Sequence, residues 1–193
     1  MGSVRALYAL ALVLVASAAM AAEPSQDEGK LLFETCKGCH AIPNYKTNYP
    51  TYKVPKLGGQ NPQYIVDALK GYRDGTRTHT TMHAQAATLT DEQMLAIGNY
   101  VHSLATLTTG AGSPPEKAAL CATCHGGNGI APAPNFPNLA GQHRDYLKHS
   151  LEQYKSQGRQ NAIMVGFAGP LTDEDIATIT AYYSSQPGLQ TAH

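Results

Sequence analysis

The chain is poor in charge and in cysteine, and both shortages narrow the functions open to it. Only 15% of its 193 residues are charged, and 14 Lys and Arg balance 14 Asp and Glu. It shows no basic patch and no run of like charge, which argues against nucleic-acid binding. All four cysteines fall in two short motifs, so no spare cysteine remains to act as a thiolate ligand.

Long apolar runs are also missing, except at the N-terminus. Arg5 precedes an apolar stretch from Ala6 to Ala19, and Ala19-Met20-Ala21 offers a small-residue cleavage site. We therefore predict a signal peptide over residues 1–21 and an exported, soluble mature chain. The stretch is shorter than the about 20 residues that comfortably span a membrane, and an uncleaved N-terminal anchor is the alternative.

The cysteines form two copies of Cys-x-x-Cys-His, Cys36 to His40 and Cys121 to His125. This pentapeptide is the attachment signature of c-type haem, in which two thiols form thioethers and the histidine becomes the proximal iron ligand. A four-cysteine zinc site or two redox disulfides are the alternatives, but neither explains a histidine after each pair. We predict two covalently bound haem c groups, attached through Cys36, Cys39, Cys121 and Cys124, with His40 and His125 as proximal ligands.

The chain is a tandem repeat. Leu57-Gly58-Gly59-Gln60 recurs 82 positions later as Leu139-Ala140-Gly141-Gln142, and Leu89-Thr90-Asp91-Glu92 recurs at the same offset. The two haem motifs lie 85 positions apart, so the first copy carries a three-residue insertion between His40 and Pro55. Each copy is too long for one unit of a solenoid. We predict two similar domains, residues 22–107 and 116–193, joined by a short linker over residues 108–115.

Apolar residues recur at helical spacing in each copy, and no segment alternates convincingly like a strand. Helices are expected from about Pro62 to Tyr72 and from Arg144 to Tyr154, and a last helix in each copy should start at Thr90 or Thr172. Ser113, followed by two prolines and an acid, predicts the N-cap of the helix that leads into the second haem motif. The fold class is all-α.

The second axial ligand of each iron decides its chemistry. A methionine thioether raises the reduction potential and closes the site for electron transfer. Beyond the signal peptide the chain contains Met82, Met94 and Met164, of which only Met82 and Met164 are equivalent in the repeat. We predict these two as distal ligands, each in an irregular segment before the last helix. Met94 is expected to fill the core.

Two histidines compete with Met82 for the first iron. His79 and His83 flank it, and either would produce a bis-histidine haem of lower potential. Their counterparts in the second copy are Asn161 and Val165, so the repeat does not support them.

Two matching prolines, Pro55 and Pro137, have two interpretations. Each could offer its carbonyl to the ring N–H of His40 or His125, which would fix the ring and raise its basicity. Each could also be an ordinary turn proline. The sequence leaves both open.

Taken together, these motifs resemble the class I cytochromes c, and among them the dihaem c-four group of bacterial periplasms. The resemblance rests on the two haem motifs, Pro-x-Leu-x-Gly-Gln, Met-x6-Leu-Thr-Asp-Glu and a tyrosine in each last helix. It implies two helical domains related by a pseudo-twofold axis, with both haems near their interface. It also implies a periplasmic protein that carries single electrons between redox protein partners, with a membrane terminal oxidase as a typical acceptor and no small-molecule substrate.

The rival function is an enzyme, or the cytochrome subunit of one, such as a peroxidase or a sulfur-compound or alcohol dehydrogenase. A peroxidase needs an open iron position, which the paired Met82 and Met164 argue against.

One departure from the repeat is the segment from Ala41 to Lys56, which is longer than its counterpart and holds Tyr45, Tyr49 and Tyr52. It could cover the first haem, form a docking surface or simply pack on its own tyrosines. Because the two haem environments differ, we expect unequal reduction potentials.

Overall fold

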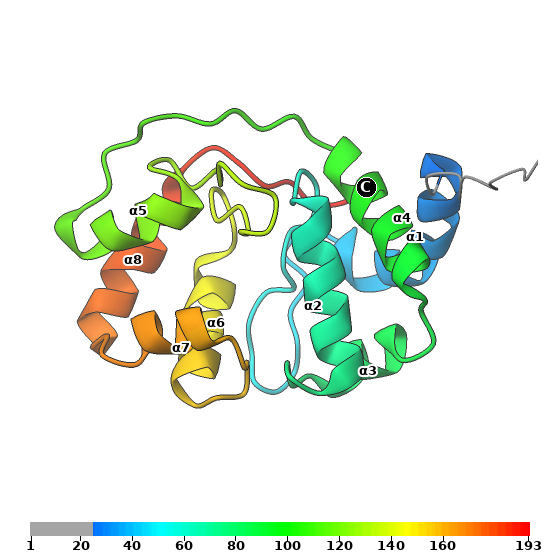
Figure 1. The fold of residues 1–193 in the computed structure, drawn as a ribbon, viewed down its shortest axis with the longest axis horizontal. Coiled ribbons are helices and arrows are strands. Elements are labelled where there is room, and N and C mark those ends of the chain that lie inside the picture. The colour runs from blue at the N-terminus through cyan, green and yellow to red at the C-terminus, as the bar shows by residue number, and fades with distance from the viewer. Residues whose placement is uncertain (1–24) are drawn as a thin grey trace, which may run out of the picture.

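A computed structural model describes residues 25–193 (Figure 1), so the predicted signal peptide lies outside the described residues. The first half contains α1 (Gln26–His40), α2 (Pro62–Asp74), α3 (Thr80–Ala86) and α4 (Asp91–Ser103). The second half contains η1, a 3-10 turn (Glu116–Ala118), α5 (Ala119–His125), α6 (Arg144–Lys155), α7 (Ala162–Ala168) and α8 (Asp173–Ser185).

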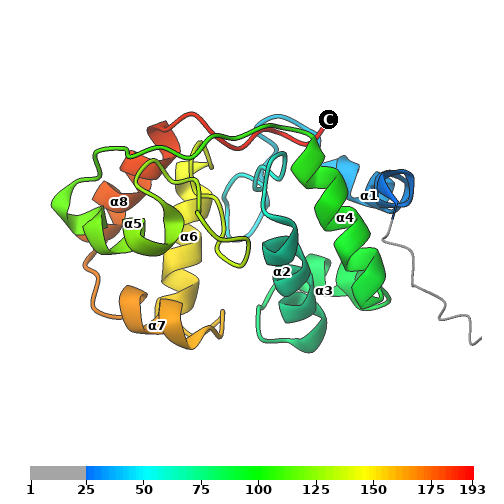
Figure 2. The ribbon, with the colours of Figure 1, turned by 45° about the horizontal axis from the view of Figure 1, so that its top comes forward.

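The prediction of an all-α fold is confirmed. Within residues 25–193 the only β pairing consists of three isolated bridges, and no helix there is long and apolar enough to cross a membrane. Figures 1 and 2 show the two halves side by side, and the linker after α4 and the tail after α8 both run along one edge between them.

The last helix of each half begins where the sequence predicts. Thr90 caps α4 and Thr172 caps α8, and each forms a capping box with the residue three positions on, Gln93 or Asp175. These reciprocal bonds satisfy main-chain N–H groups that the first helical turn leaves free.

The predicted N-cap at Ser113 is wrong. The second half opens with η1, whose preceding residue, Pro115, is extended (φ −61°, ψ 159°) and makes no side-chain cap bond. A residue before a proline is disfavoured in the helical conformation, so two successive prolines delay the helix. The main-chain N–H of Ser113 instead donates to the hydroxyl of Tyr182 (3.0 Å).

Asp175 makes the α8 capping box dependent on pH. The main-chain N–H of Thr172 and the ammonium of Lys117 lower the pKa of Asp175 to about 2, from an ordinary value of 3.8. A carboxylate with a lowered pKa in the folded state stabilises the fold above its unfolded pKa and loses that contribution as the pH falls. We therefore expect Asp175→Asn to lower the denaturant midpoint at pH 7, and the difference from the wild type to shrink steadily below about pH 3.8. Asp173→Asn, in the same helical turn, is the control, and a pH-independent difference for Asp175→Asn would contradict the assignment.

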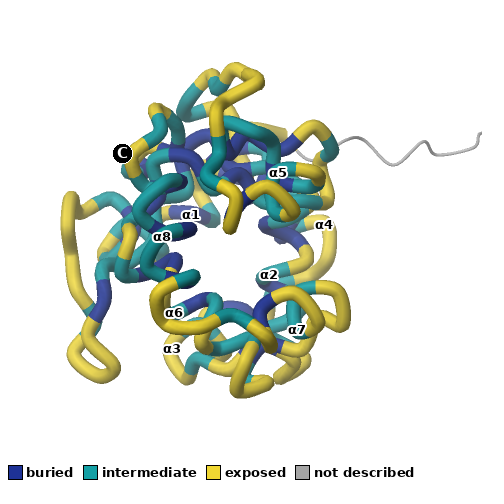
Figure 3. The backbone as a smooth tube through the Cα atoms, turned by 90° about the vertical axis from the view of Figure 1, so that its left-hand side faces the viewer, coloured by how far each residue is buried: buried dark blue, intermediate teal, exposed yellow. Residues whose placement is uncertain are grey.

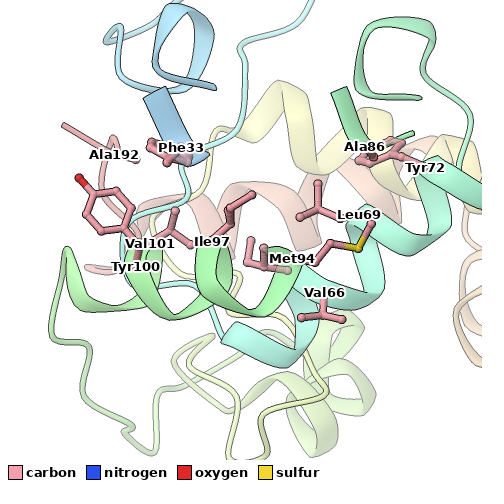
Figure 4. Close-up of a cluster of buried hydrophobic side chains, with 11 residues drawn as sticks. Phe33, Val66, Leu69, Tyr72, Ala86, Met94, Ile97, Tyr100, Val101 and Ala192 are labelled. Carbon is pink, nitrogen blue, oxygen red and sulfur yellow. The ribbon is translucent and has the colours of Figure 1, made fainter. Parts of the chain in front are cut away.

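Each half has its own apolar core. In the first half, α2 contributes Val66 and Leu69, and α4 contributes Met94, Ile97 and Val101 (Figure 4). A separate cluster in the second half joins Ala118, Leu147, Ile179 and Tyr183. Met94 is fully buried, as expected for a core residue.

The C-terminal tail crosses from the second half to the first. Gly58 and Gln190 exchange two main-chain hydrogen bonds (2.9 and 3.0 Å), and the N–H of Ala192 donates to the carbonyl of His40 (3.3 Å). Ala192 is fully buried in the first core. The tail therefore holds the two halves together.

The tyrosine-containing segment after α1 crosses in the opposite direction. Tyr52 is buried and stacks on His149 of α6, with ring centroids 4.2 Å apart, while Tyr49 is exposed. The main-chain N–H of Lys53 donates to Asp145 (3.0 Å). This segment packs on the second half rather than only on its own tyrosines.

Candidate haem-binding site

One cavity of about 930 Å³ spans both halves of the molecule, within the usual size range of cofactor sites. Figure 3 shows buried and intermediate segments beside α2 and α8 next to the middle of the view, while most of the exposed backbone lies at the periphery. The lining includes all eight residues predicted to attach or ligate haem: Cys36, Cys39, His40, Met82, Cys121, Cys124, His125 and Met164.

The two motif histidines end α1 and α5 and are buried. The Nδ1 of His40 lies 2.9 Å from the carbonyl oxygen of Pro55, and that of His125 lies 3.0 Å from the carbonyl of Pro137. A carbonyl only accepts, so each Nδ1 carries the proton and each Nε2 keeps a lone pair for a metal. Burial also lowers the pKa of both rings, which favours the neutral, ligating form. Of the two interpretations of the prolines, the structure has the one in which the carbonyl accepts.

Met82 and Met164 lie in short helices, α3 and α7, rather than in the irregular segments that we predict from the sequence. The residue three positions earlier caps each helix by accepting a hydrogen bond from the methionine N–H, His79 through Nδ1 (3.2 Å) and Asn161 through Oδ1 (3.0 Å). A seven-residue helix is too short to show helical periodicity, so this polar cap was the signal available in the sequence.

The structure does not favour either histidine that competes with Met82. The Nδ1 of His79 accepts from the main-chain N–H of Met82 (3.2 Å), so the neutral ring carries its proton on Nε2 and has no free lone pair. The Nδ1 of His83 donates to the carbonyl of Tyr72 (2.8 Å), and His83 is not among the residues that line the cavity.

The structure joins none of the four cysteines in a disulfide, and all four line the cavity. Among the described residues no cluster of three or more His, Cys, Asp or Glu side chains could hold a metal ion, so the two cysteine pairs do not meet in a zinc site. Burial raises the pKa of Cys36 and of Cys121. The arrangement fits attachment of one haem at each pair.

A buried pair of arginines provides a second test of fit. Arg77 and Arg159 face each other in an antiparallel bridge between the halves, and both donate to the hydroxyl of Tyr146 (2.8 and 3.3 Å). Neither has a carboxylate partner within residues 25–193, and the Nε of Arg77 is buried without a hydrogen-bond acceptor. Buried charges require compensation. Both guanidinium groups also stack on tyrosine rings, but these rings and hydroxyls carry no formal negative charge. Haem carries two carboxylates, so a cavity lined by arginines without carboxylate partners fits that group.

The two ends of the cavity differ in polarity. Leu120, Ile163 and Phe167 line the second half's end and are 68%, 58% and 47% exposed. Their counterparts in the repeat, which line the first half's end, are all polar: Thr35, Thr81 and Gln85.

Comparison with known proteins supports this geometry. The model of the cytochrome c family matches residues 26–105 and 117–186. Cytochrome c4 of Stutzerimonas stutzeri is 40% identical over 103 residues, covering 49% of this chain and 47% of that protein. The chain thus spans about half the length of this curated relative. A thiosulfate dehydrogenase electron acceptor of Thiomonas intermedia is 27% identical over 197 residues, covering 92% and 87%.

A solved structure agrees over most of the chain. The cytochrome c4 structure of Acidithiobacillus ferrooxidans superposes with a TM-score of 0.65 at 28% identity, over 79% of this chain and 99% of that one. The fold of two tandem haem-binding halves is therefore shared along nearly the whole described chain.

Proposed function

We propose that this chain, which belongs to the cytochrome c family and carries two covalently bound haem c groups, transfers single electrons between redox protein partners in the periplasm. The observation that carries the proposal is the one cavity that holds two complete sets of two cysteines, one histidine and one methionine. Haem iron supplies the one-electron change between its ferrous and ferric states.

The proposed ligand sets follow the two halves. Cys36 and Cys39 attach one haem, with His40 and Met82 as axial ligands of its iron. In the second half Cys121 and Cys124 attach the other, with His125 and Met164 as axial ligands. Two protein ligands close each iron to exogenous molecules, which suits electron transfer.

The chain's own residues keep each site rigid. The carbonyls of Pro55 and Pro137 orient the ligand rings through the bonds of 2.9 and 3.0 Å described above. The caps at His79 and Asn161 fix the start of the helices that carry the methionines. Fixed ligands limit the rearrangement that accompanies oxidation or reduction, a general requirement for fast electron transfer.

The test is optical spectroscopy of the purified mature holoprotein, oxidised and reduced, with carbon monoxide or cyanide added. We expect two low-spin haems, the weak far-red band of methionine-ligated ferric haem, and no reaction with carbon monoxide. A high-spin haem, or ready binding of carbon monoxide at one iron, would overturn the assignment of Met82 or Met164 and favour an enzyme.

A second candidate is the electron-accepting partner or subunit of a sulfur-compound dehydrogenase. It is supported by the similarity to a thiosulfate dehydrogenase electron acceptor over 92% of this chain. Stopped-flow reduction by a thiosulfate dehydrogenase, and oxidation by membranes containing a haem-copper oxidase, would separate the partners. Fast reduction by the dehydrogenase favours this candidate, and fast oxidation by the membranes supports a terminal oxidase as acceptor.

We expect the two haems to have unequal potentials, with the haem at Cys121 and Cys124 the higher. Apolar surroundings disfavour the more highly charged ferric state, and Ile163 and Phe167 stand where the first half has polar residues. Redox titration of the wild type should show two steps, and the double variant Ile163→Thr, Phe167→Gln should bring them closer. A single unsplit wave with equal microscopic potentials would contradict this expectation.

A further inference from the structure

Two glutamines that match in the repeat, Gln60 and Gln142, each reach into the opposite half of the molecule. Both side chains are buried. Their contacts are the same on both sides, which a chance packing arrangement would not produce.

The side chain of Gln142, in the second half, forms two hydrogen bonds with the main chain of Lys56 in the first. Its Nε2 donates to the carbonyl of Lys56 (2.9 Å), and its Oε1 accepts from the N–H of the same residue (3.0 Å). The ammonium of Lys56 in turn donates to the carbonyl of Gly141 (2.7 Å). Three hydrogen bonds thus join the two halves at this point.

The side chain of Gln60, in the first half, forms the same two hydrogen bonds with the main chain of Asn138 in the second. Its Nε2 donates to the carbonyl of Asn138 (3.0 Å), and its Oε1 accepts from the N–H of Asn138 (2.8 Å). The side-chain amide of Asn138 donates to the carbonyl of Gly59 (2.9 Å). Gly59 and Gly141 have φ of 84° and 70°, a left-handed conformation that favours glycine.

Lys56 and Asn138 each follow the proline whose carbonyl accepts a hydrogen bond from the haem-motif histidine. The carbonyl of Pro55, which accepts from His40, and the N–H of Lys56 belong to one planar peptide unit. A hydrogen-bonded chain therefore runs from the ring of His40 through that peptide to Gln142 in the other half. The equivalent chain runs from His125 through the Pro137–Asn138 peptide to Gln60.

We propose that each half positions and tunes the proximal histidine of the other half's haem, with Gln142 acting on His40 and Gln60 acting on His125. The inference rests on the proposed role of these histidines as iron ligands. Hydrogen bonds in a chain polarise one another, so a peptide N–H bonded to glutamine leaves its carbonyl a better acceptor. That carbonyl accepts a stronger hydrogen bond from the ring N–H. The imidazole then becomes a stronger electron donor to iron, which favours the ferric state.

The test compares Gln142→Leu with Gln60→Leu in the holoprotein. Both potentials are measured by redox titration, and haem methyl resonances in NMR spectra assign each to its haem. Gln142→Leu should raise the potential of the haem at Cys36 and Cys39, and Gln60→Leu that of the haem at Cys121 and Cys124. The hydrogen bond is present in both oxidation states, so only the difference in its strength shifts the reduction equilibrium. The expected shift is therefore at most about fivefold, the full net value of one hydrogen bond.

Each substitution should shift the potential of the haem in the opposite half, and this crossed pattern serves as an internal control. Local loosening would move the haem in the substituted half or both haems alike, and either result would overturn the proposal. If a variant fails to fold, the wild type supplies a second readout. The side-chain amide protons of Gln142 should exchange slowly with solvent and respond to oxidation of the haem at His40. Fast exchange, or no response, would overturn the proposal.

The same samples separate this inference from the proposed function. Loss of the low-spin, carbon-monoxide-resistant spectrum in the wild type would overturn the ligand assignment itself. An intact spectrum without crossed shifts would overturn only the role of the glutamines.

Discussion

Replacing Met164 with alanine is expected to open the second iron to carbon monoxide and to lower its reduction potential by roughly a few tenths of a volt, because axial ligands set haem potentials over a range of about 0.8 V. The second half is the better place for this test. The positions that flank Met164 and match His79 and His83 are Asn161 and Val165, so no neighbouring histidine can replace the lost thioether.

The measurement is a carbon monoxide titration followed by redox titration of the holoprotein. The haem at Cys36 and Cys39 should keep its spectrum and serve as an internal reference. Met94→Ala is the matched control, since Met94 is fully buried in the first core and does not line the cavity. An unchanged haem spectrum in Met164→Ala would show that another group ligates the second iron.

Phe33→Ala is expected to destabilise the first half by about 3–5 kcal/mol, the usual cost of removing a buried phenylalanine. Phe33 is fully buried and packs on Tyr100, with ring centroids 5.6 Å apart. Such a loss is a large fraction of the about 5–15 kcal/mol that separates folded from unfolded protein. Denaturant unfolding of the holoprotein, followed by circular dichroism, measures it.

The second half suggests a compensating substitution. Its counterpart of Phe33 is Ala118, and its counterpart of Val101 is Tyr183, so large and small residues have exchanged places between the two cores. Adding Val101→Phe to Phe33→Ala should therefore recover part of the lost stability. Phenylalanine is chosen because the hydroxyl of Tyr183 is buried without a partner. No recovery would show that the two cores are packed differently.

Much of the fold and of the candidate site could be predicted from the sequence, because the relevant signals are local or repeated. The haem motifs confine attachment and proximal ligation to short segments, and the capping boxes at Thr90 and Thr172 mark helix starts through contacts three residues apart. The repeat offset selected Met82 and Met164 over Met94, and both line the cavity. The position of these methionines in α3 and α7 was missed, since two turns of helix leave no periodic pattern.

The sequence alone thus determined the haem motifs, the tandem organisation, the helical class and the candidate ligands. Only the tertiary structure decided how the halves meet: through the hydrogen bonds of Gln60 and Gln142 to the opposite main chain, the facing arginines Arg77 and Arg159, and the tail at Ala192. The physical reason is the separation of the partners along the sequence. The features in the first group are marked by short motifs or by recurrence at a fixed offset. The residues in the second group bond partners about 80 or more positions away, and a single sequence does not show which residues form such contacts.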